Sequence, residues 1–238
     1  MKEFPKAIRN LSERDVHIWK FDIAVSGNDL SEYEERLDSF ERERASRFRF
    51  SEDRDRFLCG RILLRQLLGT YLHKDPASIN LHTTPKGKPV LETKEDQQMH
   101  FNISHSGDLI LLGFSLSPVG VDVEKVSRQV DIDKVSKNYF SDTERQMIKS
   151  ASRENKAALF FDIWTKKEAV IKGLGKGLGI SLNSFNVLET SGCVKWEPEN
   201  RSTRINWYVH AVDTNSAYKA AFATPVKDVE ISYFSLNE

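Results

Sequence analysis

The chain has 238 residues, enough for one ordinary domain or two small ones with a sizeable core. Its hydrophobic fraction of 39% and aromatic fraction of 10% are typical of a globular protein and exclude a disordered chain. The 35 basic residues equal the 35 acidic ones, so no net charge would hold the protein on nucleic acid or an anionic membrane.

Two further features of the sequence concern its compartment. Apolar runs such as Leu109 to Leu112 are far too short to span a bilayer, and residues 1–14 are polar rather than signal-like. Cys59 and Cys193 have no spacing typical of a disulfide framework or a zinc site. The sequence therefore predicts a cytoplasmic protein with two ordinary thiols and no membrane association.

The start of the chain predicts one strand followed by two helices. Alternation of apolar residues over Val16–Ile23 predicts a strand with one apolar face. Helical spacing over residues 31–47 predicts a helix that begins with a capping box formed by Ser31 and Glu34. A second helix is predicted from Ser51 to the Asp75-Pro76 pair, because proline stops a helix.

The middle of the chain predicts strands and then a long helix. Residues 101–103 and 109–116 are predicted strands, joined across a short polar turn. Ser117-Pro118 marks a candidate boundary between two domains, 1–117 and 118–238. Beyond it, residues 120–124 predict a short strand, and residues 154–174 a long helix.

The order of elements suggests an internal repeat. Phe140-Ser141-Asp142 echoes Phe50-Ser51-Glu52, and a long helix follows each time. Phe57 and Gly69 of the earlier helix match Phe161 and Gly173 of the later one, and Gly113-Phe114 resembles Ala221-Phe222. Internal duplication and chance similarity both remain open on this pattern.

Two carboxylates stand at alternate positions of the predicted strand 120–124. Asp122 and Glu124 would project from one face about 6–7 Å apart, since alternate strand residues share a face. Carboxylate oxygens suit magnesium, and we expect both groups to be partly exposed ligands. The alternative is an edge strand with a solvated acidic face.

The helix 154–174 adds a third carboxylate. Trp164, Glu168 and Lys172 follow one another at i+4 steps, which places Glu168 beside the apolar face of the helix. Glu168 and Lys172 could complete a magnesium and phosphate site with the two strand carboxylates. The alternative is a surface pair worth about 0.3–0.5 kcal/mol. Lys166 and Lys167 need no special role on this pattern.

The glycine run from Gly173 to Gly179 fits no phosphate-binding motif, because it ends a helix instead of opening one.

Three other groups of residues could hold an anion. Residues 101–107 place Ser104 and His105 at a strand exit, and residues 86–89 form a basic turn. Arginines are frequent between residues 42 and 65, and their planar groups suit phosphate. Each of these could equally be an ordinary polar turn or a solvated face.

Taken in order along the chain, these segments resemble the 4′-phosphopantetheinyl transferases of the surfactin type. The resembling segments are Arg44 to Arg65, Gly87-Lys88-Pro89, Phe101 to Ser106, Gly120 to Glu124, Phe140 to Glu144, and Trp164 to Lys172. The resemblance implies an α+β fold with two similar halves in one chain, a monomeric pseudo-dimer with the active site in the cleft between them. It also implies transfer of the 4′-phosphopantetheine arm of coenzyme A to a serine of an apo carrier protein, with release of adenosine 3′,5′-bisphosphate.

The resemblance further implies roles for individual residues. Asp122, Glu124 and Glu168 would hold magnesium, Glu168 would act as the base, and Lys172 would neutralise or protonate the leaving group. The coenzyme A contacts that it implies, besides Lys172, are Arg44, Arg56, Lys86, Lys88, Ser104 and His105. Residues 1–117 would thus hold the 3′-phosphate and adenosine, and 118–238 the metal, while 125–138 would receive an acyl or peptidyl carrier.

Two other functions remain possible. A metal-dependent pyrophosphate hydrolase could use the same carboxylates and lysine to direct water at phosphorus, although no Nudix-type block is present. The second is a coenzyme A binding module without catalysis. The presence of all four candidate catalytic residues, Asp122, Glu124, Glu168 and Lys172, argues against it.

Overall fold

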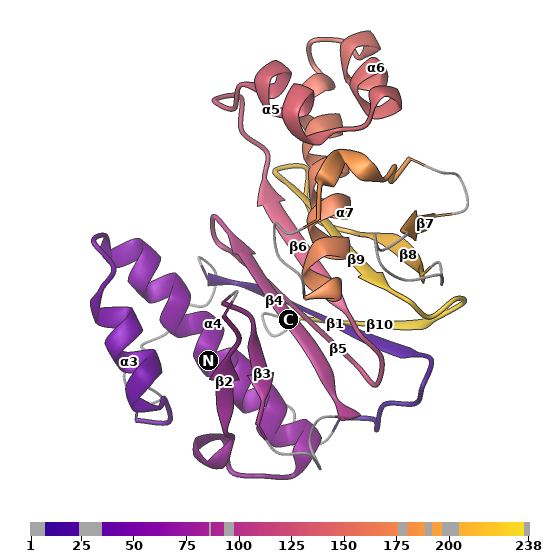
Figure 1. Ribbon diagram of the computed structural model, residues 1–238. Coiled ribbons are helices and arrows are strands. Elements are labelled where there is room, and N and C mark those ends of the chain that lie inside the picture. The colour runs from indigo at the N-terminus through magenta and orange to yellow at the C-terminus, as the bar shows by residue number, and fades with distance from the viewer. Residues whose placement is uncertain are drawn as a thin grey trace.

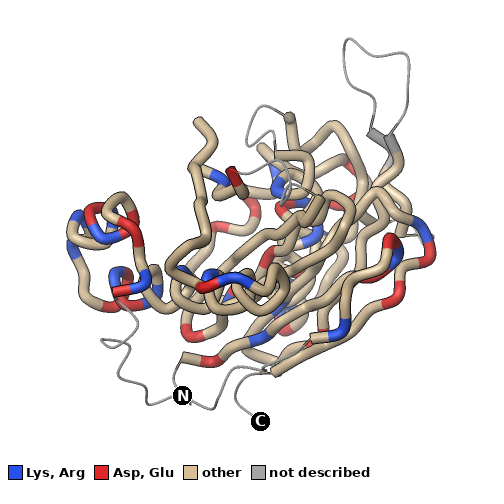
Figure 2. Tube along the Cα trace, turned by 90° about the horizontal axis from the view of Figure 1, so that it is seen from below, with Lys and Arg blue, Asp and Glu red and all other residues tan. Residues whose placement is uncertain are grey.

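The computed structural model describes residues 8–23, 35–85, 87–92, 98–175, 180–188, 192–196 and 205–235. Two four-stranded sheets are each covered by one long helix (Figure 1); one is antiparallel, and the other is mixed because the C-terminal strand runs parallel to its neighbour. Within these ranges, no helix is long and apolar enough to cross a membrane. Lys and Arg are interspersed with Asp and Glu along the chain (Figure 2), in keeping with the zero net charge.

The first half has a four-stranded sheet in the order β10-β1-β5-β4 and a separate β2-β3 hairpin. Its elements before residue 118 are β1 (Asp15–Asp22), α3 (Ser39–Ser46), α4 (Ser51–Leu72), a 3-10 turn (Pro76–Ser78), β2 (Leu81–Thr83), β3 (Pro89–Leu91), β4 (His100–Ser106) and β5 (Leu109–Ser115). Leucines of α4 and aromatic residues of β1, β4 and β5 form the core beneath this sheet. The predicted strands and the long second helix are confirmed.

The second half has a four-stranded sheet in the order β6-β9-β8-β7. Its elements are β6 (Gly120–Lys125), α5 (Ile132–Tyr139), α6 (Asp142–Ser150), α7 (Lys156–Leu174), a 3-10 turn (Leu182–Ser184), β7 (Cys193–Trp196), β8 (Ile205–Val212) and β9 (Tyr218–Thr224). Figure 1 shows α7 alongside β6 and β9, with α5 and α6 at its far end. Apolar residues of α7, β7, β8 and β9 form the second core.

The two halves repeat one topology. In the first, the chain runs β1, α4, β4, β5 with strand order β1-β5-β4, and in the second it runs β6, α7, β8, β9 with order β6-β9-β8. Gly113 of β5 pairs with Ile18, and Ala221 of β9 pairs with Asp122, which matches the sequence echo in register. The internal duplication and the α+β pseudo-dimer are confirmed.

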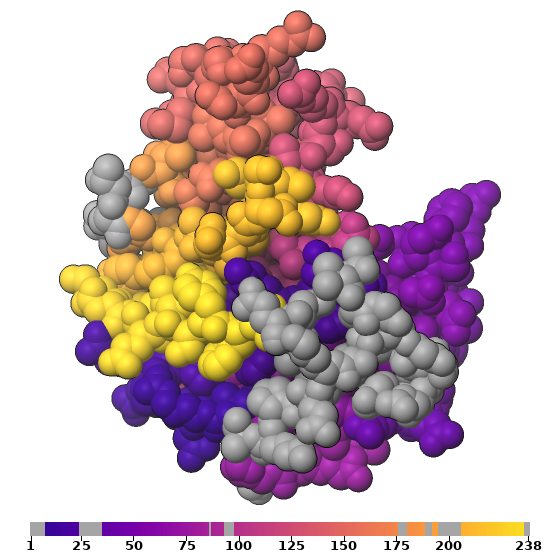
Figure 3. Space-filling view, turned by 180° about the vertical axis from the view of Figure 1, so that it is seen from behind, coloured from indigo at the N-terminus to yellow at the C-terminus, as the bar shows by residue number. Residues whose placement is uncertain are grey.

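The last strand links the halves. β10 (Glu230–Ser235) runs parallel to β1 and so completes the sheet of the first half. Phe234 stacks on Trp19 at 4.3 Å between ring centroids and meets the ring of His17 edge-on at 5.1 Å. Figure 3 shows the yellow C-terminal segment against the indigo N-terminal one. A further apolar cluster joins the two sheets through β1, β5, β6 and β9.

The first predicted helix begins later than its sequence pattern indicates. α3 starts at Ser39, and Asp38 forms the capping box with Glu41, since each side chain accepts the other's backbone N–H. The predicted cap, Ser31 with Glu34, lies outside the described residues. Arg65 of α4 donates to Glu41 at 2.7 Å, and both side chains are buried. The ion pair fixes the start of α3 on α4, which helical spacing alone does not reveal.

Candidate active site

The site begins where helix α7 lies directly on strand β6. A Cβ added to Gly120 would come within 2.0 Å of the Ala169 carbonyl oxygen and 2.2 Å of the Gly173 nitrogen. Only glycine permits so close an approach of helix backbone to strand backbone. The contact brings Glu168 and Lys172, the residues that precede Ala169 and Gly173 in the chain, against the strand that carries Asp122.

Asp122 is the buried centre of this contact. Its side chain is 3% exposed, which contradicts the expectation of a partly exposed carboxylate. Oδ1 accepts from Lys172 Nζ at 2.6 Å and from Ser104 Oγ at 3.0 Å, whereas Oδ2 has no hydrogen-bond partner among the described residues. Burial raises the pKa of Asp122, and the Lys172 charge opposes that rise. Lys172 pairs across to β6 instead of forming the surface pair with Glu168.

Glu124 and Glu168 are half-buried neighbours of Asp122. Desolvation raises the pKa of Glu168, and the charges of Asp122 and Glu124 raise it further. The pKa of Glu124 is also raised, first by desolvation and then by Asp122, while a hydrogen bond from Ser106 opposes the rise. Three carboxylates that disfavour one another's ionisation form a place where an added cation is stabilised.

The chemistry of the three carboxylates fits a hard divalent cation, but the side chains would have to move closer together to bind one. Carboxylate oxygens are the ligands that magnesium prefers, and the buried Oδ2 of Asp122 is an available acceptor. Over the described ranges, however, no group of three or more Asp, Glu, His or Cys side chains is gathered closely enough to hold a metal ion as it stands. The Lys172 ammonium supplies the positive charge next to Asp122.

Side chains of β4 join the two halves beside these carboxylates. They stand at alternate positions on one face of the strand, and each accepts a backbone N–H of β6: Asn102 from Val121 at 2.8 Å, Ser104 from Val123 at 3.3 Å, and Ser106 from Lys125 at 3.1 Å. The sequence pattern predicts that this strand ends at residue 103 and that a turn comes after it, whereas the strand continues to Ser106. Continued alternation over residues 102–106 is the signal that could have revealed Asn102 and Ser106.

A pocket of about 350 Å³ opens between the halves, next to the hydrogen bonds that join β4 to β6. Among its lining residues are Arg44, Lys88, Ser104, His105, Glu168 and Lys172. Lys88 Nζ donates to the Lys172 carbonyl at 3.0 Å, and desolvation lowers the pKa of Lys88. The pKa of the exposed His105 is lowered, first by desolvation and then by Arg56 and Lys172. The pocket therefore places several cationic or donor groups beside the carboxylates.

The remaining predicted contacts differ in their placement. The Arg44 guanidinium lies 5.3 Å from the centroid of the Phe57 ring, which holds it at the pocket edge. Arg56 does not line this pocket, because its Nε donates to the Gly107 carbonyl at 2.6 Å and its NH1 pairs with Asp53 at 2.7 Å. Lys86 lies outside the described residues. Arg44, Lys88, Ser104 and His105 are thus brought together, whereas Arg56 is held at the turn after β4.

Lys167 has a role that the sequence pattern did not reveal. Its side chain is fully buried and pairs with Glu144 at 2.8 Å, and Nζ also donates to the carbonyls of Leu182 and Phe185. Glu144 in turn caps α6 and accepts the Val187 N–H. Through Lys167, which directly precedes Glu168, this ion pair links α7 to α6 and to the segment that follows α7.

The repeat carries this chemistry in one half only. Strand register places Ile18 and Lys20 of β1 where β6 has Asp122 and Glu124. Counting from the matched pair Phe57 and Phe161, Leu64 and Leu68 of α4 stand where α7 has Glu168 and Lys172. Because α4 has leucines at the positions equivalent to Glu168 and Lys172, the first half cannot form a second site of this kind.

Comparisons with known proteins match both halves. The family model described as "4'-phosphopantetheinyl transferase, N-terminal" matches residues 24–116, and "4'-phosphopantetheinyl transferase superfamily" matches residues 118–223. The chain is similar to 4'-phosphopantetheinyl transferase Sfp of Bacillus subtilis, with 34% identity over 80% of this chain and 84% of that protein. A second Bacillus subtilis 4'-phosphopantetheinyl transferase is 35% identical over 76% and 78%. The transferase HetI of a Nostoc species is 34% identical over 69% and 70%.

Proposed function

This chain belongs to the 4′-phosphopantetheinyl transferase family, and from that premise we infer its reaction. It transfers the 4′-phosphopantetheine group of coenzyme A to a serine hydroxyl of an apo carrier protein. The serine oxygen forms a bond to the β-phosphorus of coenzyme A, and the bond from that phosphorus to the bridging oxygen breaks. The products are the holo carrier and adenosine 3′,5′-bisphosphate.

The observation that carries the site assignment is the meeting of Asp122, Glu124, Glu168 and Lys172 beside the cationic pocket. We propose that the three carboxylates hold magnesium, which supplies positive charge to the pyrophosphate of coenzyme A. Glu168 would also accept the proton of the carrier serine, and because a cation-bound carboxylate is a weak base, this role depends on its placement near the attacking hydroxyl. Lys172 would stabilise the charge that develops on the leaving bisphosphate.

The coenzyme A contacts are assigned from the pocket. Ser104, His105 and Lys88 would contact the phosphates or adenosine, and Arg44 the 3′-phosphate. Lys86 and Arg56 remain proposals: the hydrogen bond of Arg56 to Gly107 places it near His105, from which it lowers that residue's pKa. Charge-assisted hydrogen bonds from such groups are the strongest that proteins offer to phosphate.

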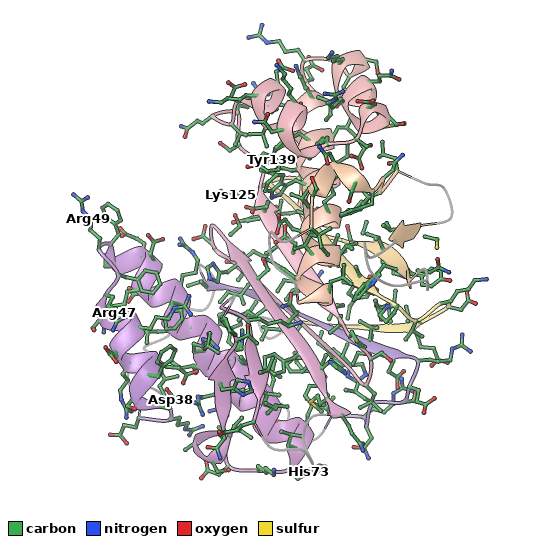
Figure 4. All side chains as sticks on the ribbon, in the orientation of Figure 1. Asp38, Arg47, Arg49, His73, Lys125 and Tyr139 are labelled. Atoms are coloured by element: carbon green, nitrogen blue, oxygen red, sulfur yellow. The ribbon has the colours of Figure 1, made fainter. Side chains whose placement is uncertain are left out.

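The carrier would dock on residues 125–138 and the end of α5. Lys125, Lys134 and Lys137 are exposed, and Tyr139 is 41% exposed. Figure 4 labels both Lys125, the last residue of β6, and Tyr139, the last residue of α5. The composition of the segment is mixed, but its lysines and Arg128 outnumber Asp131 and Asp133, and an excess of positive charge beside an exposed aromatic residue suits an acidic partner. A monomeric state and a cytoplasmic location stay predictions from the sequence.

The reaction is tested by intact-protein mass spectrometry of apo acyl and peptidyl carriers incubated with the enzyme, magnesium and coenzyme A. We expect each accepted carrier to gain the mass of one phosphopantetheine group only in complete mixtures. Hydrolysis of coenzyme A without a mass gain on any carrier would favour the pyrophosphate hydrolase. Binding of coenzyme A with neither change would favour a module without catalysis.

The 3′-phosphate assignment predicts a difference between two ligands. Coenzyme A is expected to bind about tenfold or more tightly than 3′-dephospho-coenzyme A, because one lost charge-assisted contact is worth about 1.5–3 kcal/mol. Calorimetric titration of both ligands measures the ratio. Arg44→Ala should reduce the ratio of the two affinities. Arg47→Ala is the matched control, because the exposed Arg47 side chain pairs with Glu43. Equal affinities of the wild type for both ligands would remove Arg44 and His105 from the phosphate site.

A further inference from the structure

Ser106 links the last residue of strand β4 to a carboxylate of the other half. Its Oγ donates to Glu124 Oε2 at 2.8 Å and accepts the backbone N–H of Lys125 at 3.1 Å. A hydroxyl has one proton, and the amide occupies an acceptor site of the oxygen. The N–H of Lys125 therefore directs the single hydroxyl proton of Ser106 toward Glu124.

The same pattern occurs two residues earlier on the strand. Ser104 Oγ accepts the Val123 N–H at 3.3 Å and donates to Asp122 Oδ1 at 3.0 Å. Alternate residues of β4 thus each hold one of the two carboxylates of β6. A carboxylate has about four acceptor sites, so a hydroxyl bound to one oxygen orients the group and leaves capacity for a cation.

The turn after Ser106 is fixed from both halves. From α4, Arg56 donates to the Gly107 carbonyl at 2.6 Å, and from β9, the Tyr218 hydroxyl accepts the Asp108 N–H at 3.0 Å. Gly107 has a φ of +56°, and a Cβ there would lie 2.7 Å from the Tyr218 hydroxyl. This backbone cannot shift without breaking contacts to both halves, so the position of Ser106 is set before any ligand binds.

We propose that Ser106 is a positioning residue that orients Glu124 for cation binding. The proposal rests on the proposed function, because it takes Glu124 as a ligand. It assigns Ser106 no contact with the substrate and no part in proton transfer. Its effect is on cation affinity, since outer hydrogen-bond partners of metal ligands typically change that affinity by about 10- to 100-fold.

The test measures Mn²⁺ binding by the loss of the free-ion electron paramagnetic resonance signal, with coenzyme A present and a titration of coenzyme A alone subtracted. Ser106→Ala is expected to weaken Mn²⁺ binding about tenfold, and Ser106→Thr to retain it within about threefold. Ser115→Ala is the matched control, because Ser115, like Ser106, is the last residue of a strand in the first sheet, and its hydroxyl donates to the Asp15 carbonyl. Urea unfolding of all variants follows their stability.

Glu124→Gln separates the two levels of the proposal. If Glu124→Gln weakens Mn²⁺ binding while Ser106→Ala binds like the wild type, the positioning role is wrong and the metal assignment stands. Wild-type binding by Glu124→Gln overturns both. Equal weakening by Ser106→Ala and Ser115→Ala, or no retention in Ser106→Thr, also overturns the positioning role, because the effect would then not come from this hydroxyl.

Discussion

Glu168→Gln is expected to lower transfer turnover by about 10²- to 10⁴-fold, the range that a positioned general base contributes. The change keeps the size and polarity of the side chain. It removes the proton acceptor and one of the three negative charges of the site. Raised magnesium should restore little of the loss, because an amide oxygen cannot accept the serine proton. Steady-state transfer assays across a magnesium series measure this, and near-normal turnover would remove Glu168 from catalysis.

Lys172→Ala provides the comparison on the same helix. It should lower turnover and weaken coenzyme A binding together, by about 10- to 10³-fold, with little change in magnesium dependence, as expected for lost charge stabilisation. Lys166→Ala is the matched control, since Lys166 pairs with Asp162 on the same helix at 2.7 Å, away from the carboxylates of the site. Equal loss in Lys166→Ala would point to a general effect of charge on α7.

Glu144→Ala is expected to lower the free energy of unfolding by about 3–5 kcal/mol, because it leaves the Lys167 ammonium buried without its ion partner. Both side chains are 0% exposed, and the pair is 2.8 Å apart. Burial already lowers the pKa of Lys167, so the charged form depends on Glu144 for compensation. Urea denaturation monitored by circular dichroism gives the difference.

The stability test has two controls. Asp142→Ala removes an exposed acidic residue of the same helix, paired with Arg145, and should cost less than about 1 kcal/mol. The double variant Glu144→Gln with Lys167→Met should recover much of the loss, because it removes the buried charge as well. A cost below about 1 kcal/mol for Glu144→Ala would show that Lys167 finds enough compensation in the Leu182 and Phe185 carbonyls.

Local pattern was sufficient for the elements that have strong periodicity. Apolar spacing predicted α4 and α7, proline and glycine predicted their ends, and alternation predicted β1, while β5 and β6 were predicted as short strands on either side of the Ser117-Pro118 break. The left-handed Gly175, with a φ of +66°, ends α7 as the glycine run indicated. These predictions succeed because the apolar periodicity and the terminating residues that mark each element lie within the element itself or next to it.

The carboxylates Asp122, Glu124 and Glu168 with Lys172 were also found from spacing and family resemblance. Their environment was not. Asp122 is buried because α7 meets β6 at two glycines, and the partner of Lys172 lies 50 residues away on another element. Sequence spacing places side chains on one face of an element, but it does not give the element packed against that face.

The sequence by itself therefore determined the long helices and the chemical groups of the site, and it suggested a repeat that the strand topology then confirmed. Only the tertiary structure decided that Lys167 is buried with Glu144, that Ser106 holds Glu124, and that β10 joins β1. In each case the partners come from distant parts of the chain. Their pairing follows from packing of whole sheets and helices, because burying a charge or a strand edge is favourable only where the fold supplies its partner.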